Sequence, residues 1–350
     1  MRRKLALLLA LVMVLSVVAS GCTGSQTEGE GEGNGEAIND EVYELKVSHI
    51  ASESDPIHQG WMLLKETLEE KTDGRITVTI FGNKQLSNSN NEDAEKVQQN
   101  IVQATSVPTS SLAALGNLKE YQVFDYPYLF ETEEDLYTVL DSEAFAELSQ
   151  QLAQVTGVKA YGGYNLGWVQ ISTNKNPINT PADLKGQKIR TMSSELQMKI
   201  AEAFGANPTI VNYGEVFTAC QQGTVDGIMT STGLYVSDRF YEVQKYMGCT
   251  RPIALLHVPI INNSWYEGLP DDLKAIFDES MEIYLEGVRQ YELDFEAAAI
   301  EELKAKGMEV KEYTTDEMQA FKDAAANIII DKADIAGQEI IDTVKTLLNK

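Results

Sequence analysis

The sequence is short of positive charge, histidine and cysteine. Its 28 Lys and Arg residues are outnumbered by 53 Asp and Glu residues, which gives a formal net charge of −25. A chain this acidic is repelled by phosphate backbones, so no nucleic-acid partner is expected. The histidines are His49, His58 and His257, and because their spacing matches no set of zinc ligands, no metal site is expected.

Cysteine is equally scarce, since the chain contains only Cys22, Cys220 and Cys249. Three cysteines exclude a scaffold held together by many disulfides. In an exported protein Cys220 and Cys249 could pair, but two buried free thiols are the favoured interpretation.

Motifs of the common enzyme classes are missing as well. The chain has no phosphate-binding loop, no G-x-G-x-x-G after a strand, no G-x-S-x-G and no H-E-x-x-H. The glycine-rich stretch GEGEGNG lies in a polar, low-complexity segment, and the many carboxylates are typical of a solvated surface. We therefore expect a protein with no catalytic residues and no cofactor.

The N-terminal stretch MRRKLALLLALVMVLSVVASGC combines a basic start, an apolar run and small residues before a cysteine. The run is too short for a confident membrane span and is typical of a secretory signal. Its ending, ASGC, resembles a bacterial lipobox, which predicts a lipoprotein signal peptide over residues 1–21 and a lipidated Cys22 that anchors the protein to the extracytoplasmic side of the cell membrane. An ordinary signal peptide with an incidental cysteine is the alternative. Residues 22–41 are rich in Gly, Glu, Ser and Asn, so we expect a flexible tether.

The rest of the chain alternates between two apolar patterns. Period-two stretches predict strands and periods of three to four residues predict helices, and they follow one another from a strand over 43–50 and a helix over 57–72 onward, with a single helix near 132–154. The stretch TTDEMQAFKDAA opens a further helix with a capping-box spacing, Thr314 to Glu317. This alternation indicates an α/β fold. The apolar strand expected over 250–261 contains Pro252 and Pro259, which favour a place at a sheet edge or a hinge.

A long helix is expected after Pro270. About 35 helix-compatible residues follow it, with apolar side chains at steps of three to four residues but without a strict heptad. A helix of this length usually crosses more than one domain, so we expect it to run as a spine against two domains.

Arg190 raises a question of its own. The stretch GQKIRTM, residues 186–192, reads as a short strand that carries Arg190 near its end, followed by a helix that begins near Ser193. An arginine at such a place commonly pairs with a nearby acid, and this chain has many acids. The sequence around Arg190 changes that expectation.

Residues 184–227, LKGQKIRTMSSELQMKIAEAFGANPTIVNYGEVFTACQQGTVDG, resemble the central block of the solute-binding proteins of tripartite ATP-independent periplasmic (TRAP) transporters, the DctP family. The block contains, in the family's order, a strand ending in K-I-R, the turn GANP, a helix with an aromatic-x-E-V start, and VDG. The stretches GRITVTIFGNKQL, VFDYPYLFETEED and NNSWYEGLP are similar to further segments of the family.

The resemblance implies an α/β, two-lobed, periplasmic-binding-protein-like fold with hinge strands and a long helix that spans both lobes. We expect residues 42–166 with 256–295 to form the first lobe and residues 167–255 with 296–350 to form the second. The implied function is that of a monomeric extracytoplasmic receptor, which binds a small organic acid between the lobes and delivers it to the membrane permease subunits of a TRAP transporter. A solute-binding lipoprotein of an ATP-driven importer, or a ligand-sensing receptor of a signalling system, is the alternative.

The resemblance also assigns residues to the ligand site. In the family the arginine of K-I-R forms a two-pronged salt bridge with the ligand carboxylate, and Arg190 occupies that position; a guanidinium fork matches a carboxylate geometrically. Tyr213 stands where the family has an aromatic residue that packs on the ligand. Thr230 replaces a common ligand-contacting asparagine, and Val169 stands where many members carry a second arginine.

Other expected contacts rest on weaker grounds. Trp168 would make the pocket more apolar, and Asn262 could offer its amide near the cleft. Three hydroxyl residues at the end of the strand over 101–107 would face the cleft from the first lobe, with plain turn chemistry as their alternative: Ser106, Thr109 and Ser110. The missing second arginine and the apolar tryptophan together favour a monocarboxylate with an apolar or aromatic body.

Overall fold

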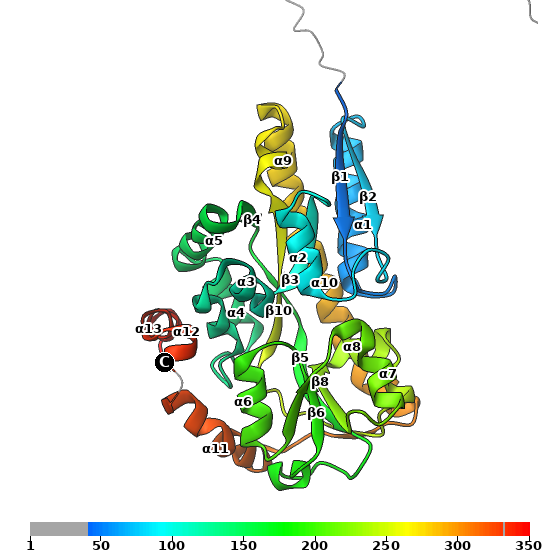
Figure 1. The fold of residues 1–350 in the computed structure, drawn as a ribbon, viewed down its shortest axis with the longest axis vertical. Coiled ribbons are helices and arrows are strands. Elements are labelled where there is room, and N and C mark those ends of the chain that lie inside the picture. Colours follow the sequence, from blue (N-terminus) through cyan, green and yellow to red (C-terminus); the bar gives the residue numbers. More distant parts are fainter. Residues whose placement is uncertain (1–40, 332) are drawn as a thin grey trace, which may run out of the picture. The chain divides into compact units, whose positions relative to one another are not determined.

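The structure is a computed structural model that describes residues 41–331 and 333–350. The expected signal peptide (1–21), Cys22 and all of the expected tether except Glu41 lie outside the described residues. Within the described part, helices and strands alternate, and the strands form one mixed sheet in the order β2-β1-β3-β10-β5-β8-β6-β7 (Figure 1). The expected α/β class is confirmed.

The first half of this sheet is built from parallel strands joined by helices. The chain passes through β1 (Tyr43–Ser48), α1 (Pro56–Lys71), β2 (Ile76–Phe81), α2 (Asn90–Gln98) and β3 (Ala104–Pro108). Side-chain caps start the helices, because Asp55 accepts a hydrogen bond from the backbone N–H of Ile57 and Ser89 from that of Glu92. We call β2, β1, β3 and the short β4 (Val158–Ala160) the first half-sheet.

The second half of the sheet lies below the first in Figure 1 and holds the K-I-R strand. We call its strands β8, β6, β7, β9 and β11 the second half-sheet. In chain order, its elements are β6 (Lys188–Thr191), α6 (Glu195–Ala203), β7 (Asn207–Ile210), α7 (Val216–Gln221), β8 (Gly227–Ser231), α8 (Thr232–Ser237), β9 (Tyr246–Gly248) and β11 (Glu309–Lys311). Both neighbours of β6 run parallel to it, so the carboxyl ends of β8, β6 and β7 point the same way.

Two strands are shared by the two halves. β5 (Tyr164–Thr173) pairs with β10 (Ala254–Asn262) near its start and with β8 and β9 along its later residues. β10 pairs with β3 on one side and with β4 and β5 on the other. The edge position that its prolines suggested is therefore wrong. Pro259 fits because its backbone faces the break between β4 and β5, where its carbonyl accepts a hydrogen bond from Tyr161 N at 3.0 Å.

The long helix expected after Pro270 is present as α10 (Asp271–Ala305). It packs against α1 beside the first half-sheet and against α8 and β11 beside the second, as the sequence predicted. The approach to α1 is close: a Cβ on Gly60 would lie 3.0 Å from the Tyr284 ring, and one on Gly287 would lie 2.3 Å from the Leu63 side chain. A side chain at Gly287 would require the Leu63 side chain to move, and one at Gly60 would be tightly packed, so the glycines allow the two helices to lie close together.

Several helices were missed or merged in the sequence analysis. α3 (Thr109–Gly116) directly follows β3, and a single helix expected near 132–154 is in fact two, with Ser142 capping the second. The remaining elements are η1 (Lys119–Asp125), α4 (Glu133–Leu140), α5 (Glu143–Thr156), η2 (Pro181–Leu184), η3 (Tyr213–Glu215), η4 (Phe240–Glu242) and α9 (Asn263–Glu267).

The C-terminal helices return across the molecule. α11 (Thr315–Asp331) begins with the expected capping box between Thr314 and Glu317 and packs against α6. α12 (Ala333–Ala336) and α13 (Gln338–Leu347) pack instead against η1 and α4, and Lys350 Nζ lies 2.8 Å from the Asp135 carboxylate. The sequence-based division, which assigned all of 296–350 to the second lobe, stays a prediction.

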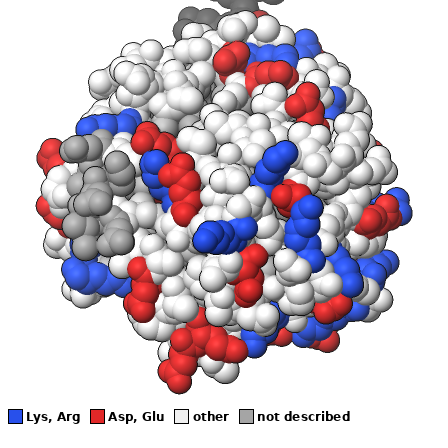
Figure 2. Space-filling model, turned by 60° about the horizontal axis from the view of Figure 1, so that its bottom comes forward, with Lys and Arg blue, Asp and Glu red and all other residues white. Residues whose placement is uncertain are grey.

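The outer surface agrees with the acidic, charge-rich composition. Figure 2 shows one face on which Lys and Arg side chains are interspersed with Asp and Glu side chains. Among the described residues, no helix combines the length and the apolar character that crossing a membrane requires.

Candidate ligand-binding site

Arg190 is a buried cation that forms no ion pair with a carboxylate of the described residues. It lies in β6, one residue before the carboxyl end of the strand, and only 3% of the residue is exposed. Its Nε donates a hydrogen bond to the carbonyl of Val211 at 3.0 Å, and no described carboxylate forms an ion pair with it. Burial lowers the pKa of the guanidinium to about 10, so it still carries its charge at pH 7.

Asp238, a carboxylate that Tyr213 contacts, has other partners. The Tyr213 ring lies 5.6 Å from the Arg190 guanidinium, and the Tyr213 hydroxyl donates to Asp238 Oδ2 at 2.5 Å. Asp238 also lies 3.6 Å from Lys84 Nζ. Its charge is therefore balanced by these two partners, and the free edge of the guanidinium is left for another group.

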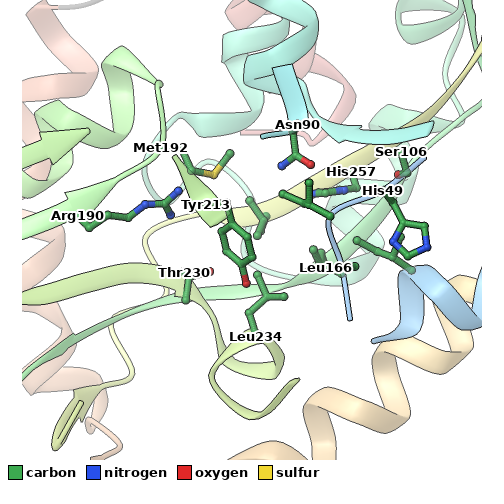
Figure 3. A pocket seen from close by; sticks show the side chains of 14 residues that line it. His49, Asn90, Ser106, Leu166, Arg190, Met192, Tyr213, Thr230, Leu234 and His257 are labelled. Atoms are coloured by element: carbon green, nitrogen blue, oxygen red, sulfur yellow. The ribbon is translucent and has the colours of Figure 1, made fainter. Parts of the chain in front are cut away.

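A small cavity opens beside Arg190, with a volume of about 40 Å³ (Figure 3). In Figure 3 Arg190 lies at one end, while His49, Ser106 and His257 lie at the other. The wall between them is largely apolar: Ile50, Ala51, Ile57, Leu166, Met192, Leu234 and Leu255. Asn90, Tyr213 and Thr230 add polar atoms to it.

Both half-sheets contribute to this wall. The loop after β1, the first turns of α1 and α2, and β3 supply residues from one side, while β6, β8, η3 and α8 supply them from the other. The shared strands β5 and β10 form the floor with Leu166, Leu255 and His257. The cavity therefore lies between the two halves, at the carboxyl ends of their parallel strands, where α/β sheets commonly bind ligands.

The histidines of the far end are buried and uncharged. Burial lowers the pKa of both His49 and His257 to about 3, with the neighbouring His58 contributing at His49. His49 Nε2 lies 3.2 Å from His58 Nδ1, and the Ser106 hydroxyl lies 2.7 Å from that of Tyr164.

The structure brings four of the predicted site residues to the cavity: Arg190, Tyr213, Thr230 and Ser106. Ser110 lines a shallow pocket that adjoins it and shares Arg190 and Met192 with it. Thr109 is buried in the first turn of α3, outside the residues that line either pocket.

Trp168 and Asn262 lie away from Arg190. Gly167 has φ +89°, and at this point the register between β5 and β10 shifts, so Trp168 turns from the side of Leu166 into a separate groove. There its ring lies 4.5 Å from the Arg251 guanidinium. Asn262 caps α9, since its Oδ1 accepts from Trp265 N at 3.0 Å and its amide donates to the Val97 carbonyl at 2.8 Å.

The sequence analysis missed the two cavity histidines because it weighed histidine only as a metal ligand. His49 directly follows β1, and His257 lies in the apolar strand over 254–262. Their positions on a strand end and on a central strand were the available signal. Among the described residues, no group of three His, Cys, Asp or Glu side chains is placed to hold a metal ion.

The thiols of Cys220 and Cys249 are buried and unpaired. Burial raises the pKa of Cys220 to about 11 and that of Cys249 to about 12. Both are therefore protonated at neutral pH and poor nucleophiles.

Comparison with known families decides the nature of this site. The model of the family described as bacterial extracellular solute-binding protein, family 7 (DctP) matches residues 47–333. This chain belongs to the DctP family. The family comprises solute-binding transport proteins and is not a family of enzymes.

Known relatives match most of the length of this DctP-family chain. The C4-dicarboxylate-binding periplasmic protein DctP of Rhodobacter capsulatus is 28% identical over 305 residues, which cover 86% of this chain and 90% of the relative. A TRAP periplasmic solute-binding protein of Sulfurospirillum deleyianum, solved with bound succinate, superimposes with a TM-score of 0.81 at 28% identity, covering 88% of this chain and 99% of its own. One from Bordetella bronchispeptica, with density interpreted as pantoate, has a TM-score of 0.80 at 26% identity, covering 87% and 98%.

These matches confirm the two-lobed fold of a TRAP solute-binding protein. β5, β10 and α10 are common to both half-sheets. The cavity at Arg190 lies between the half-sheets.

Proposed function

We propose that this DctP-family protein is an extracytoplasmic receptor that binds a small organic acid between its lobes and passes it to the membrane subunits of a TRAP transporter. The observation that carries the proposal is Arg190, a buried guanidinium without an ion-pair partner among the described residues. A buried charge is costly unless it is paired. A ligand carboxylate in the adjoining cavity would supply the missing anion.

The expected interaction is strong enough to dominate affinity. A carboxylate can accept two parallel hydrogen bonds from the outer edge of a guanidinium. Each charge-assisted bond contributes about 1.5–3 kcal/mol, against the roughly 8 kcal/mol of a micromolar complex. Succinate and pantoate, named with two of the similar structures, both carry a carboxylate.

Titration calorimetry with short carboxylic acids tests this role on the dialysed protein. We expect Arg190→Gln to weaken binding by about 10²- to 10⁴-fold, because the amide loses the charge and one of the two parallel bonds. Arg239→Gln is the matched control, because Arg239 is exposed and forms its ion pair with Glu242 on the surface. Undiminished binding by the Arg190 variant would place the counter-ion elsewhere.

The lobe boundaries are also a proposal. We assign residues 42–166 with 256–295 to the first lobe and residues 167–255 with 296–331 to the second, and we return α12 and α13 to the first. Ligand that contacts both lobes favours a closed arrangement. Small-angle scattering should record a smaller radius of gyration with saturating acid, and an unchanged radius would contradict closure.

Finally, we propose that Cys22 carries the lipid that holds the receptor at the membrane. Two or three acyl chains provide stable anchoring. Intact-mass spectrometry of the mature protein should find a chain that begins at Cys22 with the added mass of the acyl groups. A mature chain with an unmodified Cys22 would contradict the anchor and leave the ligand-binding role intact.

A further inference from the structure

The end of the cavity away from Arg190 is polar but carries no charge. It consists of the Ser106 hydroxyl and the imidazoles of His49 and His257, each with 3% of the residue exposed or less. Neither histidine Nδ1 is hydrogen-bonded to another side chain. His49 interacts with His58 and with the Ala51 backbone, His257 interacts with the Ser106 backbone, and the Ser106 hydroxyl shares one hydrogen bond with Tyr164. The unbonded Nδ1 atoms and the second lone pair of the serine hydroxyl leave capacity for a further partner.

A second anion would find no counter-ion at this end. Among the described residues that line the cavity, Arg190 is the only Lys, Arg, Asp or Glu. Burial holds the two imidazoles in their neutral form at pH 7. A carboxylate placed there would be desolvated without compensation, or would have to take up a proton.

The wall between the two ends restricts the ligand further. Seven apolar side chains line the cavity between its two ends. Hydroxyl groups on the middle of a ligand would be buried there with few partners, which disfavours polyhydroxylated sugar acids. A hydrocarbon segment fits this environment.

We infer that the ligand is a short monocarboxylate with an apolar middle and a distal, uncharged hydroxyl or carbonyl group, which hydrogen-bonds to His49, His257 and Ser106. The inference rests on the proposed function, because it takes Arg190 as the partner of the single carboxylate. A hydroxyl suits the far end because it both donates and accepts, as neutral imidazoles and a serine do.

Three acids that differ only at the distal group test the inference: butyrate, 4-hydroxybutyrate and succinate. On the dialysed protein at pH 7.5, we expect 4-hydroxybutyrate to bind at least about tenfold more tightly than butyrate, because butyrate leaves the buried polar groups unpaired. Succinate should bind more weakly as well, or bind with uptake of one proton. Pantoate, a branched hydroxy acid, should behave as 4-hydroxybutyrate does.

Variants at the far end separate recognition from folding. His257→Leu should reduce the ratio of 4-hydroxybutyrate affinity to butyrate affinity towards one, and Ser106→Ala should reduce that ratio in part. His257→Gln, which keeps a donor and an acceptor, should retain more of the preference than His257→Leu. Proton uptake is measured by repeating the succinate titration in buffers of different ionisation enthalpy.

The outcomes distinguish this inference from the proposed function. If all three acids bind equally, or succinate binds most tightly without proton uptake, the inference is overturned. Weaker binding by Arg190→Gln would in that case still support the proposed function. If Arg190→Gln leaves the binding of these acids unchanged, the proposed role of the site fails as well.

Discussion

Arg190 and Arg251 both lie against aromatic rings, and they differ in burial and in the charges around them. Arg251 is exposed and stacks 4.5 Å from the Trp168 ring in an open groove of about 630 Å³. Glu133 and Glu296 line the same groove, so the cation lies among carboxylates. The Arg251 charge therefore has solvent and nearby carboxylates around it.

Arg190 lies on the other side of β5 in a cavity of about 40 Å³ with no carboxylate in its wall. A cation in such a place costs folding free energy that a ligand can offset. The contrast shows that an arginine beside an aromatic ring is not itself a sign of a binding site. Burial without a counter-ion is the informative feature, and it separates these two regions.

The largest expected effect comes from giving Arg190 an internal partner. Thr230 lies at the same end of the cavity in Figure 3. In Thr230→Asp, the new carboxylate should pair with the guanidinium and repel ligand anions, which weakens 4-hydroxybutyrate binding by about 10²-fold or more. The ligand-free variant should melt at a higher temperature than the wild type, which differential scanning fluorimetry measures.

Thr230→Asn is the matched control for this change, because it has the same shape without the charge. It should bind carboxylates nearly as well as the wild type. Wild-type affinity in the aspartate variant would show that Arg190 does not receive the ligand.

A smaller, pH-dependent effect on stability is expected at Asp55. This buried residue caps α1 and also contacts α8. The Ser237 hydroxyl of α8 donates to its Oδ2 at 3.3 Å. Burial raises the pKa of Asp55 to about 7, above the ordinary value of about 4 for an unfolded chain. The carboxyl therefore contributes stability below about pH 4 that is lost as the pH rises through 7.

Asp55→Asn removes this pH dependence and keeps a capping oxygen for Ile57 N. The melting temperature of the variant should exceed that of the wild type by a few degrees at pH 8, and the difference should shrink towards pH 5. Thermal melts from pH 5 to 8 measure it, and two parallel curves would contradict the shifted pKa.

The smallest effect should come from the second arginine of the comparison. Arg251→Gln loses its contact with the Trp168 ring, which we expect to lower the free energy of unfolding by about 0.5–1 kcal/mol. Carboxylate affinity should stay within about twofold of the wild type. Denaturant unfolding measures the change in stability, and calorimetry measures the carboxylate affinity. A loss of affinity as large as that expected for Arg190→Gln would instead place the ligand in the groove beside Arg251.

Much of the fold followed from the sequence because apolar periodicity reports directly on burial. This periodicity predicted the alternation of strands and helices and the long helix α10. The spacing of Thr314 and Glu317 predicted the capping box. The position of Arg190 at the end of a strand was predicted too, and with it the neighbourhood of Tyr213 and Thr230. The resemblance to the DctP family supplied the role of that strand end.

The remaining features depend on geometry that periodicity does not contain. Trp168 was placed with the ligand because alternation along a regular strand would keep it beside Leu166, and the positive φ of Gly167 breaks that alternation. The polar side chain of Asn262 suggested a ligand contact. It instead caps α9, a helix of only five residues that the sequence analysis did not expect. The packing of α12 and α13 against η1 and α4 is set by long-range contacts alone.

The break beside Pro259 has a mechanical consequence for the receptor. β10 runs through both lobes, and at Pro259 it lacks a backbone donor where β4 has ended and β5 has not begun. Bending the sheet at this point disrupts no backbone hydrogen bond donated by residue 259, and the register shift between Ala254 and Leu256 interrupts the ladder with β5 nearby. Both interruptions lie in a strand that the two half-sheets share, so a change in the angle between the half-sheets would break few backbone hydrogen bonds of β10 there.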